Sequence, residues 1–197
     1  MSIPMSLVQF LEKNNGLVTT YEANKCGVSN ERLCLLTKEE ELIRVGFGIY
    51  SLPDEFIDRM YITQKQKNKI IYSHETALYL HDLTDRDPIK YAVTVPTGYN
   101  SQKLKQENFM VFSVKAELHE LGITQKETIF GNLVNVYNME RTICDCIRSR
   151  QKMDASIVTD ALKVYSKRKD KNLNSLMELA EKFHISKLLR NYMEVLL

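Results

Sequence analysis

The chain has 197 residues and a formal net charge of +2, and 44% of its residues are hydrophobic. This length suits one domain or two small ones and excludes a large multidomain protein, while the apolar fraction argues against a disordered chain. No apolar run approaches the roughly 20 residues that cross a bilayer, and the N-terminal sequence lacks the pattern of a signal peptide. We therefore expect a cytoplasmic protein, without membrane contact, whose four cysteines are reduced.

The first forty residues predict three short helices separated by turn signals. Pro4 suits the first helical position (N1), and the apolar side chains that follow it recur at helical spacing. Thr19 and Glu22 have the spacing of a capping box at the start of a second helix, which would end at Gly27. Ser29 is the expected N-cap of a third helix, so only a tight turn separates the second helix from the third.

Two short apolar runs, residues 42–45 and 49–52, flank a glycine-bearing turn at residues 46–48 and predict a hairpin. Three helices with a tight turn between the second and the third, followed by such a hairpin, are typical of a winged helix-turn-helix. A small helical subdomain without a ligand is the alternative, and the tight turn and the glycine-bearing hairpin argue against it. We therefore interpret residues 1–53 as a winged helix-turn-helix DNA-binding domain.

Residues 54–72 are polar and basic with a few large apolar side chains, which is typical of a connector. Residues 73–197 then have the pattern of a second domain. Short apolar runs predict a small, mainly antiparallel sheet, and the chain after Asn138 shows helical spacing to its end. The expected fold class is α+β, with an N-terminal winged helix-turn-helix and a C-terminal domain that ends in a helical pack.

The sequence contains no recognisable motif for a metal centre or a bound cofactor. The nearest match to a dinucleotide fingerprint lies in the hairpin turn and lacks its third glycine. Cys144 and Cys146 do not have the spacing of zinc ligands, and His74 and His81 have no third ligand at a suitable distance along the chain. We therefore expect no cofactor and no metal ion.

A nuclease is the enzyme class that the composition leaves open. Asp82, Asp85 and Asp87 form an acidic cluster that could hold a catalytic metal, but aspartates are also common in turns. No acidic residue stands two positions before a lysine, as the catalytic strand of restriction-enzyme-like nucleases requires. We therefore expect a binding protein without catalytic residues.

In a helix-turn-helix the recognition helix lies in the major groove with its N-terminal residues at the base edges. Asn30 would then pair with adenine, Arg32 would read guanine, and Lys38 would reach a phosphate. The hairpin would lie near the minor groove, and the start of the second helix would donate hydrogen bonds to the DNA backbone. The side chains expected to face DNA are Thr19, Thr20, Tyr21, Ser29, Asn30, Arg32, Lys38, Arg44 and Phe47.

The charge of the N-terminal region weighs against tight nonspecific binding. Residues 1–55 carry five basic and eight acidic side chains, a balance of −3, so the rest of the chain carries +5. Because DNA affinity grows with the number of phosphates neutralised, Lys65, Lys67 and Lys69 of the connector could supply part of the contact. A winged helix that binds another protein is the alternative for such an acidic domain.

Segments along nearly the whole chain resemble one protein family, and they occur in the family's order. They are GLVTTYEANKCGVSNERLCLL and LIRVGFGIYSLP in the first domain, and YSHETALYLHDLTDRDP, YAVTVP, TIFGNLVNVY and NMERTICDCI in the second. With these segments the chain resembles the AbiEi antitoxins of abortive-infection systems, whose N-terminal domain is a winged helix.

This resemblance implies a bacterial antitoxin of a type IV toxin–antitoxin pair that acts against phage. It implies two partners: operator DNA with inverted repeats in the protein's own promoter, bound to repress the operon, and an AbiEii-type nucleotidyltransferase toxin. The C-terminal domain would counteract the toxin without a stable complex, and no catalytic activity is implied. Since the sequence has no long heptad repeat, we expect a monomer in solution that pairs on the DNA.

Three features leave alternatives open. Arg141 is expected to bond Asp145, four residues further on, in a structural role, with a functional role as the alternative. The acidic run at residues 39–41 would repel phosphate and departs from what a DNA-binding domain requires. A basic set on the C-terminal helices suits either a solvated face or an antitoxin that sequesters its toxin: Arg148, Arg150, Lys163, Lys167, Arg168 and Lys169.

Overall fold

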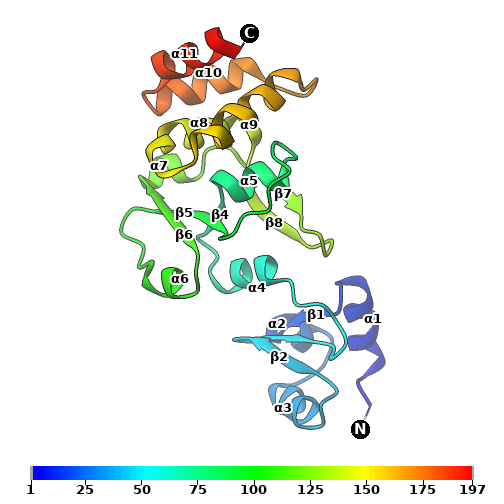
Figure 1. Cartoon of the computed structure of the whole chain (residues 1–197). Coiled ribbons are helices and arrows are strands. Elements are labelled where there is room, and N and C mark those ends of the chain that lie inside the picture. Colours follow the sequence, from blue (N-terminus) through cyan, green and yellow to red (C-terminus); the bar gives the residue numbers. More distant parts are fainter. Residues whose placement is uncertain (1, 197) are drawn as a thin grey trace. The chain divides into compact units, whose positions relative to one another are not determined.

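A computed structural model describes residues 2–196, which form two compact units (Figure 1). Unit 1 contains the residues up to Asn68 together with Glu127–Val134, and unit 2 contains Lys69–Lys126 and the residues from Asn135 onward. Over the described residues the fold is α+β, with eleven α-helices, one short 3-10 helix, a three-stranded sheet and a five-stranded sheet. No helix in this part of the chain is long and apolar enough to cross a membrane.

Unit 1 combines short helices with a three-stranded antiparallel sheet of order β1-β3-β2. Its core consists of buried aliphatic side chains from α1 and α3, including Leu7, Leu11, Leu33 and Leu36. The elements are α1 (Met5–Lys13), β1 (Leu17–Thr19), α2 (Thr20–Lys25), α3 (Asn30–Lys38), β2 (Ile43–Gly46), β3 (Ile49–Ser51) and α4 (Arg59–Gln66).

The starts of α2 and α3 follow the capping patterns of the sequence. Thr19 Oγ1 accepts a hydrogen bond from the Glu22 amide at 3.2 Å, and Glu22 Oε2 accepts one from the Thr19 amide at 2.8 Å, which forms the predicted capping box. Ser29 Oγ accepts from the Arg32 amide at 3.2 Å and caps α3. Gly27, in the turn between the two helices, has a φ of 81°, a conformation that favours glycine.

Two local features of unit 1 differ from the sequence-based expectation. Pro4 is the N-cap of α1, with an extended ψ of 140°, so the helix begins one residue later than predicted. Leu17–Thr19 form strand β1, which pairs with β3 and was not predicted. A strand of three residues is too short to show an alternating pattern, and its pairing depends on a partner some thirty residues away.

The expected connector is largely part of unit 1, because one buried carboxylate organises it. Asp58 is only 1% exposed; its Oδ1 accepts from the Tyr61 amide at 3.1 Å and caps α4. Its Oδ2 accepts from Thr128 Oγ1 at 2.6 Å and from Asn132 Nδ2 at 2.9 Å. Residues 127–134, expected within the second domain, therefore cluster with unit 1, as do residues 54–68 of the expected connector.

Unit 2 contains a five-stranded sheet of order β6-β5-β4-β8-β7. The expectation of a mainly antiparallel sheet is wrong, because β5 pairs with β6 and β4 with β8 in parallel, while β4 and β5 are antiparallel. A parallel pair needs a crossover connection, and helix α6, which the sequence pattern did not predict, provides it between β5 and β6. The elements are β4 (Ile71–Tyr72), α5 (His74–Leu80), β5 (Ala92–Pro96), α6 (Gln102–Gln106), β6 (Met110–Val114), α7 (Ala116–His119), β7 (Ile123–Glu127) and β8 (Leu133–Tyr137).

The last part of unit 2 is helical, as expected. Helix α8 is buried along almost its whole length and packs against α5, α9 and α10. The resulting core includes Ile143, Ile147, Leu162, Leu176 and Leu189. The elements are α8 (Met139–Arg148), a 3-10 helix η1 (Arg150–Lys152), α9 (Ala155–Lys167), α10 (Leu173–Lys182) and α11 (Ser186–Leu196).

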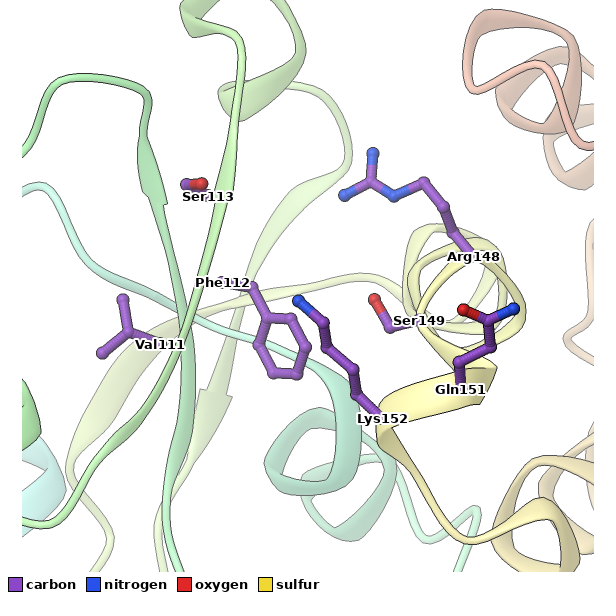
Figure 2. A pocket seen from close by; sticks show the side chains of 7 residues that line it. All are labelled: Val111, Phe112, Ser113, Arg148, Ser149, Gln151 and Lys152. Carbon is purple, nitrogen blue, oxygen red and sulfur yellow. The ribbon is translucent and has the colours of Figure 1, made fainter.

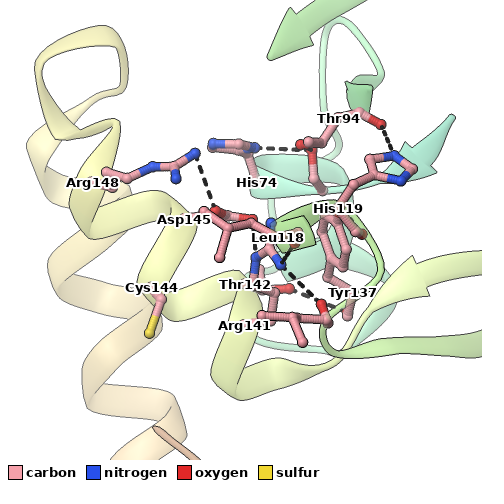
Figure 3. Close-up of polar contacts among 12 residues, drawn as sticks. His74, Thr94, Leu118, His119, Tyr137, Arg141, Thr142, Cys144, Asp145 and Arg148 are labelled. Carbon is pink, nitrogen blue, oxygen red and sulfur yellow. Dashed lines mark hydrogen bonds and ion pairs between the residues drawn. The ribbon is translucent and has the colours of Figure 1, made fainter. Parts of the chain in front are cut away.

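A buried ion pair lies at the centre of unit 2 (Figure 3). Arg141 Nε donates to Asp145 Oδ2 at 2.9 Å, and both side chains are fully buried, which confirms the predicted structural bond. Arg141 Nη1 also donates to the carbonyls of Leu118 at 2.6 Å and Leu121 at 2.9 Å. Burial raises the pKa of Asp145, and the facing guanidinium groups oppose this shift. The pair thus ties α8 to α7 and to the loop between α7 and β7.

Candidate nucleic-acid interface

Unit 1 has a hollow of about 530 Å³ where α2, α3, α4 and the β2–β3 hairpin meet. Six of the nine side chains expected to face DNA line it, although they come from three separate segments of the sequence. The lining residues are Thr19, Thr20, Tyr21, Asn30, Arg44, Phe47, Gly48, Ile49, Tyr50 and Lys65. None of these residues is acidic, whereas two of them are cations.

The start of α2 is fastened directly to the turn of the hairpin. The Thr20 amide donates to the Gly48 carbonyl at 2.8 Å, and Thr20 Oγ1 donates to the same oxygen at 3.3 Å. Gly48 has a φ of 65°, and a Cβ atom there would lie 3.1 Å from Thr20 Oγ1, so both conformation and space favour glycine. This connection fixes the spacing between the polar start of the helix and the tip of the hairpin.

The hairpin presents an aromatic ring and a guanidinium group to solvent. Phe47 at its tip is 87% exposed, which is unusual for so large an apolar side chain. The Arg44 guanidinium lies 5.5 Å from the centre of the Phe47 ring, and Arg44 Nε donates to the Gly46 carbonyl at 3.2 Å. These contacts hold the cation beside the ring, so the two present a combined flat surface at the hairpin tip.

Of the four residues expected on α3, the structure brings only Asn30 into the hollow. Ser29 caps the helix, and Lys38 is exposed at its far end. Arg32, expected to read a base, donates from Nη2 to the Ser2 carbonyl at 3.2 Å and is not among the lining residues. A sequence cannot show this bond, because it joins the helix to a segment thirty residues earlier.

Tyr50 and Lys65 line the hollow but were not among the side chains expected to face DNA. Lys65 was noted only for its charge, and the structure places it here because α4 packs against β2. Its amino group lies 5.1 Å from the centre of the Tyr61 ring and 3.9 Å from Glu22 Oε1. Tyr50 follows the alternation of β3, on which it is half-buried between the buried Ile49 and Ser51. A strand of three residues shows no alternation in the sequence that could have identified Tyr50.

The acidic run at residues 39–41 begins at the C-cap of α3, whereas Asn30 is the first residue of that helix. A nine-residue helix is about 14 Å long, so the carboxylates and the hollow lie at opposite ends of α3. The run therefore does not place negative charge within the hollow itself.

Four of the six members of the basic set expected on the C-terminal helices have a local partner in unit 2. Arg168 makes two 2.8 Å hydrogen bonds to Asp170, and Lys163 lies 3.7 Å from Asp160. Arg150 Nη1 donates to the Ile147 carbonyl at 3.3 Å. Lys167 and Lys169 are exposed. Arg148 is the member of this set that lines a hollow, which is a separate one within unit 2.

The acidic cluster at Asp82, Asp85 and Asp87 shows no sign of a metal centre. Among the described residues there is no group of three His, Cys, Asp or Glu side chains that could hold a metal ion. Asp87 instead accepts a hydrogen bond from Tyr79, which raises the pKa of that phenol.

Comparison with known proteins shows a similarity in fold to a solved structure and no match in sequence. No family model matches the chain, and no curated protein matches it. Among solved structures, the chain is similar to the crystal structure of the RV2827C protein from Mycobacterium tuberculosis, with a TM-score of 0.57. The two are 12% identical over 91% of this chain and 72% of that one. At such an identity the likeness shows a shared fold alone.

Proposed function

We propose that unit 1 is a winged helix-turn-helix that binds operator DNA, and that the chain is an autoregulating antitoxin of the AbiEi kind. The observation that carries the DNA-binding part is the hollow in unit 1, which gathers six of the nine expected DNA-facing side chains. Apart from Lys65 of α4, its polar groups come from the start of α2, the start of α3 and the hairpin, which are the parts that approach DNA in this kind of domain.

The roles in this proposal follow from the chemistry of each group. Asn30 reads an adenine edge, since its amide can both donate to N7 and accept from N6. Thr19, Thr20 and Lys65 contact phosphates beside it, and Lys38 contacts a phosphate further along. Arg32 is a weaker candidate for base reading than its position in the sequence predicts, because its guanidinium would first have to leave the Ser2 carbonyl.

The hairpin tip would enter the minor groove. Arg44 is attracted to the negative potential of that groove, and an exposed ring such as Phe47 can insert between base steps. Two copies of the chain would bind the two arms of an inverted repeat, and the bound pair would block transcription of the operon.

The antitoxin part of the proposal rests on the resemblance in sequence and assigns no catalytic group. Unit 2 would counteract a nucleotidyltransferase toxin without a stable complex. Four of the six basic side chains have a local partner and Lys167 and Lys169 are exposed, so the set does not favour sequestration of the toxin over a solvated face. The proposed activity would be tested by coexpression with a toxin encoded beside the gene, with growth as the readout.

Fluorescence anisotropy of the full chain on DNA from upstream of its own gene tests the DNA-binding part. Arg44→Ala and Lys65→Ala should each reduce the salt dependence of binding by about one phosphate contact. Asn30→Ala should cost about 1–3 kcal/mol on the operator and little on scrambled DNA of the same length. Lys13→Ala, at an exposed lysine of α1 outside the hollow, is the matched control. Equal DNA binding by all four variants would refute the assignment of this hollow as the DNA interface.

A further inference from the structure

Unit 2 has a hollow of about 360 Å³ between strand β6 and the end of helix α8 (Figure 2). Phe112 and Ser113 line it from the strand, and Arg148, Ser149, Gln151 and Lys152 line it from α8 and η1. The polar groups on this lining are a guanidinium, an ammonium, two hydroxyls and an amide, without any carboxylate. In Figure 2, Arg148 and Lys152 both extend from the helical side toward the strand. This arrangement suits an anion.

The positive charge of this hollow is only partly neutralised by the protein. Arg148 Nη2 lies 3.6 Å from Asp145 Oδ1, whereas the other oxygen of that carboxylate is bonded to Arg141 at 2.9 Å. One carboxylate thus faces two arginines. Lys152 is exposed and forms no ion pair within residues 2–196. The cluster of Arg141, Arg148 and Lys152 with Asp145 therefore carries a net charge of about +2 when all four groups are ionised.

A buried histidine behind the hollow orients one of its hydroxyls. His74 is 1% exposed and stacks on Phe112, with the ring centres 3.4 Å apart. Its Nε2 lies 3.0 Å from Ser149 Oγ, and its Nδ1 lies 2.9 Å from Ser73 Oγ. Burial, followed by the fields of Arg148, Arg141 and Lys152, lowers the pKa of His74 well below its usual value, so the ring is neutral.

A neutral imidazole has one donor and one acceptor nitrogen, and each nitrogen of His74 faces a serine hydroxyl. Thr94 Oγ1 donates to Ser73 Oγ at 2.9 Å and extends this chain of polar groups to β5. In the tautomer with the proton on Nε2, His74 donates to Ser149 Oγ, and the hydrogen of the Ser149 hydroxyl is available to a ligand. His74 adopts this position with a φ of 48°, an unfavourable backbone conformation for a residue other than glycine.

We propose that this hollow binds the phosphate group of a small phosphate ester. Arg148 and Lys152 supply the charge, and the hydroxyl of Ser149 donates to a phosphate oxygen. The volume is at the lower end of the range for small-molecule sites, which leaves space for a sugar-sized group attached to the phosphate. The proposal concerns unit 2 and does not depend on DNA binding by unit 1.

Isothermal titration calorimetry of the full chain with ribose 5-phosphate, inorganic phosphate and ribose tests the proposal. We expect saturable 1:1 binding of ribose 5-phosphate and no binding of ribose. Similar affinity for inorganic phosphate would mean that the phosphate contacts supply most of the binding, and weaker binding would mean that the attached group contributes. Both results support the site. Absence of saturable binding by both phosphate compounds would overturn it.

Three variants locate the binding within the hollow. Lys152→Ala removes an exposed side chain without an ion pair and should weaken binding about tenfold or more, while the fold and promoter DNA binding stay unchanged. Lys152→Glu puts a carboxylate into the hollow and should abolish binding. Lys169→Ala, at an exposed lysine elsewhere in unit 2, is the matched control and should bind as the wild type does.

Two outcomes with these variants would contradict the assignment. If Lys152→Ala bound the phosphate compounds with wild-type affinity, the hollow would not be the phosphate site. An equal loss in Lys152→Ala and Lys169→Ala would show that the phosphate binds through general surface charge. If Lys152→Glu fails to fold, the comparison of Lys152→Ala with Lys169→Ala still decides the question, because both side chains are exposed.

Discussion

The two units hold their polar groups in opposite ways. In unit 1 the polar and aromatic groups of the candidate interface are exposed, and Phe47 at the hairpin tip is 87% exposed. In unit 2 the polar groups behind the candidate hollow are buried. Arg141 and Asp145 are fully buried, and His74 is 1% exposed. Removing one partner of a buried polar pair is costly, because water cannot replace it, whereas removing an exposed group mainly affects binding. Substitutions in the two units should therefore separate stability from recognition.

The largest effect is expected from the buried ion pair of unit 2. Arg141→Met leaves Asp145 as a buried charge with only the 3.6 Å contact to Arg148, and should destabilise the protein by about 3–5 kcal/mol. The double variant Arg141→Met with Asp145→Leu should recover much of this loss, because no uncompensated charge remains. Urea denaturation measures both. A loss below about 1 kcal/mol for Arg141→Met would mean that water reaches the pair.

The second-largest effect is expected from Asp58, the buried carboxylate of unit 1. Asp58→Ala removes the acceptor for Thr128 and Asn132 as well as the cap of α4, and should cost about 2–3 kcal/mol. Asp54→Ala, at an exposed aspartate just before it, should change stability by less than about 0.5 kcal/mol. The two variants are compared by chemical denaturation. Equal stability would mean that the turn between β7 and β8 is not held through Asp58.

The third effect is the pH dependence of unit 2. The pKa of His74 is lowered by burial, so the unfolded chain binds a proton below pH 6.5 that the folded chain does not bind. Stability is therefore fully present above pH 6.5 and is lost as the pH falls, by up to about 2 kcal/mol at pH 5. Burial also lowers the pKa values of His81 and His119, which act in the same direction. His74→Gln should flatten this dependence in denaturation curves at pH 5 and pH 7, and an unchanged slope would exclude His74 as its source.

The smallest effect concerns the cap of α2. Thr19→Ala removes the hydroxyl that accepts from the Glu22 amide and should cost about 1 kcal/mol. It should also weaken promoter binding, because the start of α2 forms one side of the hollow in unit 1. Thr37→Ala is a suitable control, since its hydroxyl bonds a carbonyl within α3 and does not line the hollow. Denaturation and anisotropy are measured on both variants, and wild-type binding by Thr19→Ala would show that the cap does not position the interface.

The features that the sequence predicts well are those encoded within a few residues. The capping box at Thr19, the Ser29 cap, the glycine turn of the hairpin and the Arg141–Asp145 bond all depend on spacings of four residues or fewer. Strand β1, helix α6 and the parallel pairings were missed, because short elements carry weak patterns and pairing depends on distant segments. The hydrogen bond of Arg32 could not be predicted for the same reason, because its partner Ser2 is thirty residues away.

The two candidate sites also differ in whether nearby residues or distant segments of the chain determine them. Asn30, Arg44 and Phe47 could be selected from the sequence because a helix start and a hairpin tip are recognisable locally. The hollow of unit 2 could not, because it joins β6 to the end of α8 across some thirty-five residues of chain. Its histidine was noted in the sequence, yet the stacking on Phe112 and the bond to Ser149 depend on the folded core.

Unit 1 is not continuous along the chain, since residues 127–134 complete it after an interval of 58 residues that belongs to unit 2. A chain emerging from the ribosome can form α1 to α4 early, but Asp58 meets Thr128 and Asn132 only when most of the protein has been made. The proposed DNA-binding unit thus matures late in translation. A prematurely terminated chain that ended before residue 127 would carry α1 to α4 without the bonds of Asp58 to Thr128 and Asn132, so unit 1 is completed only when much of unit 2 has also been made.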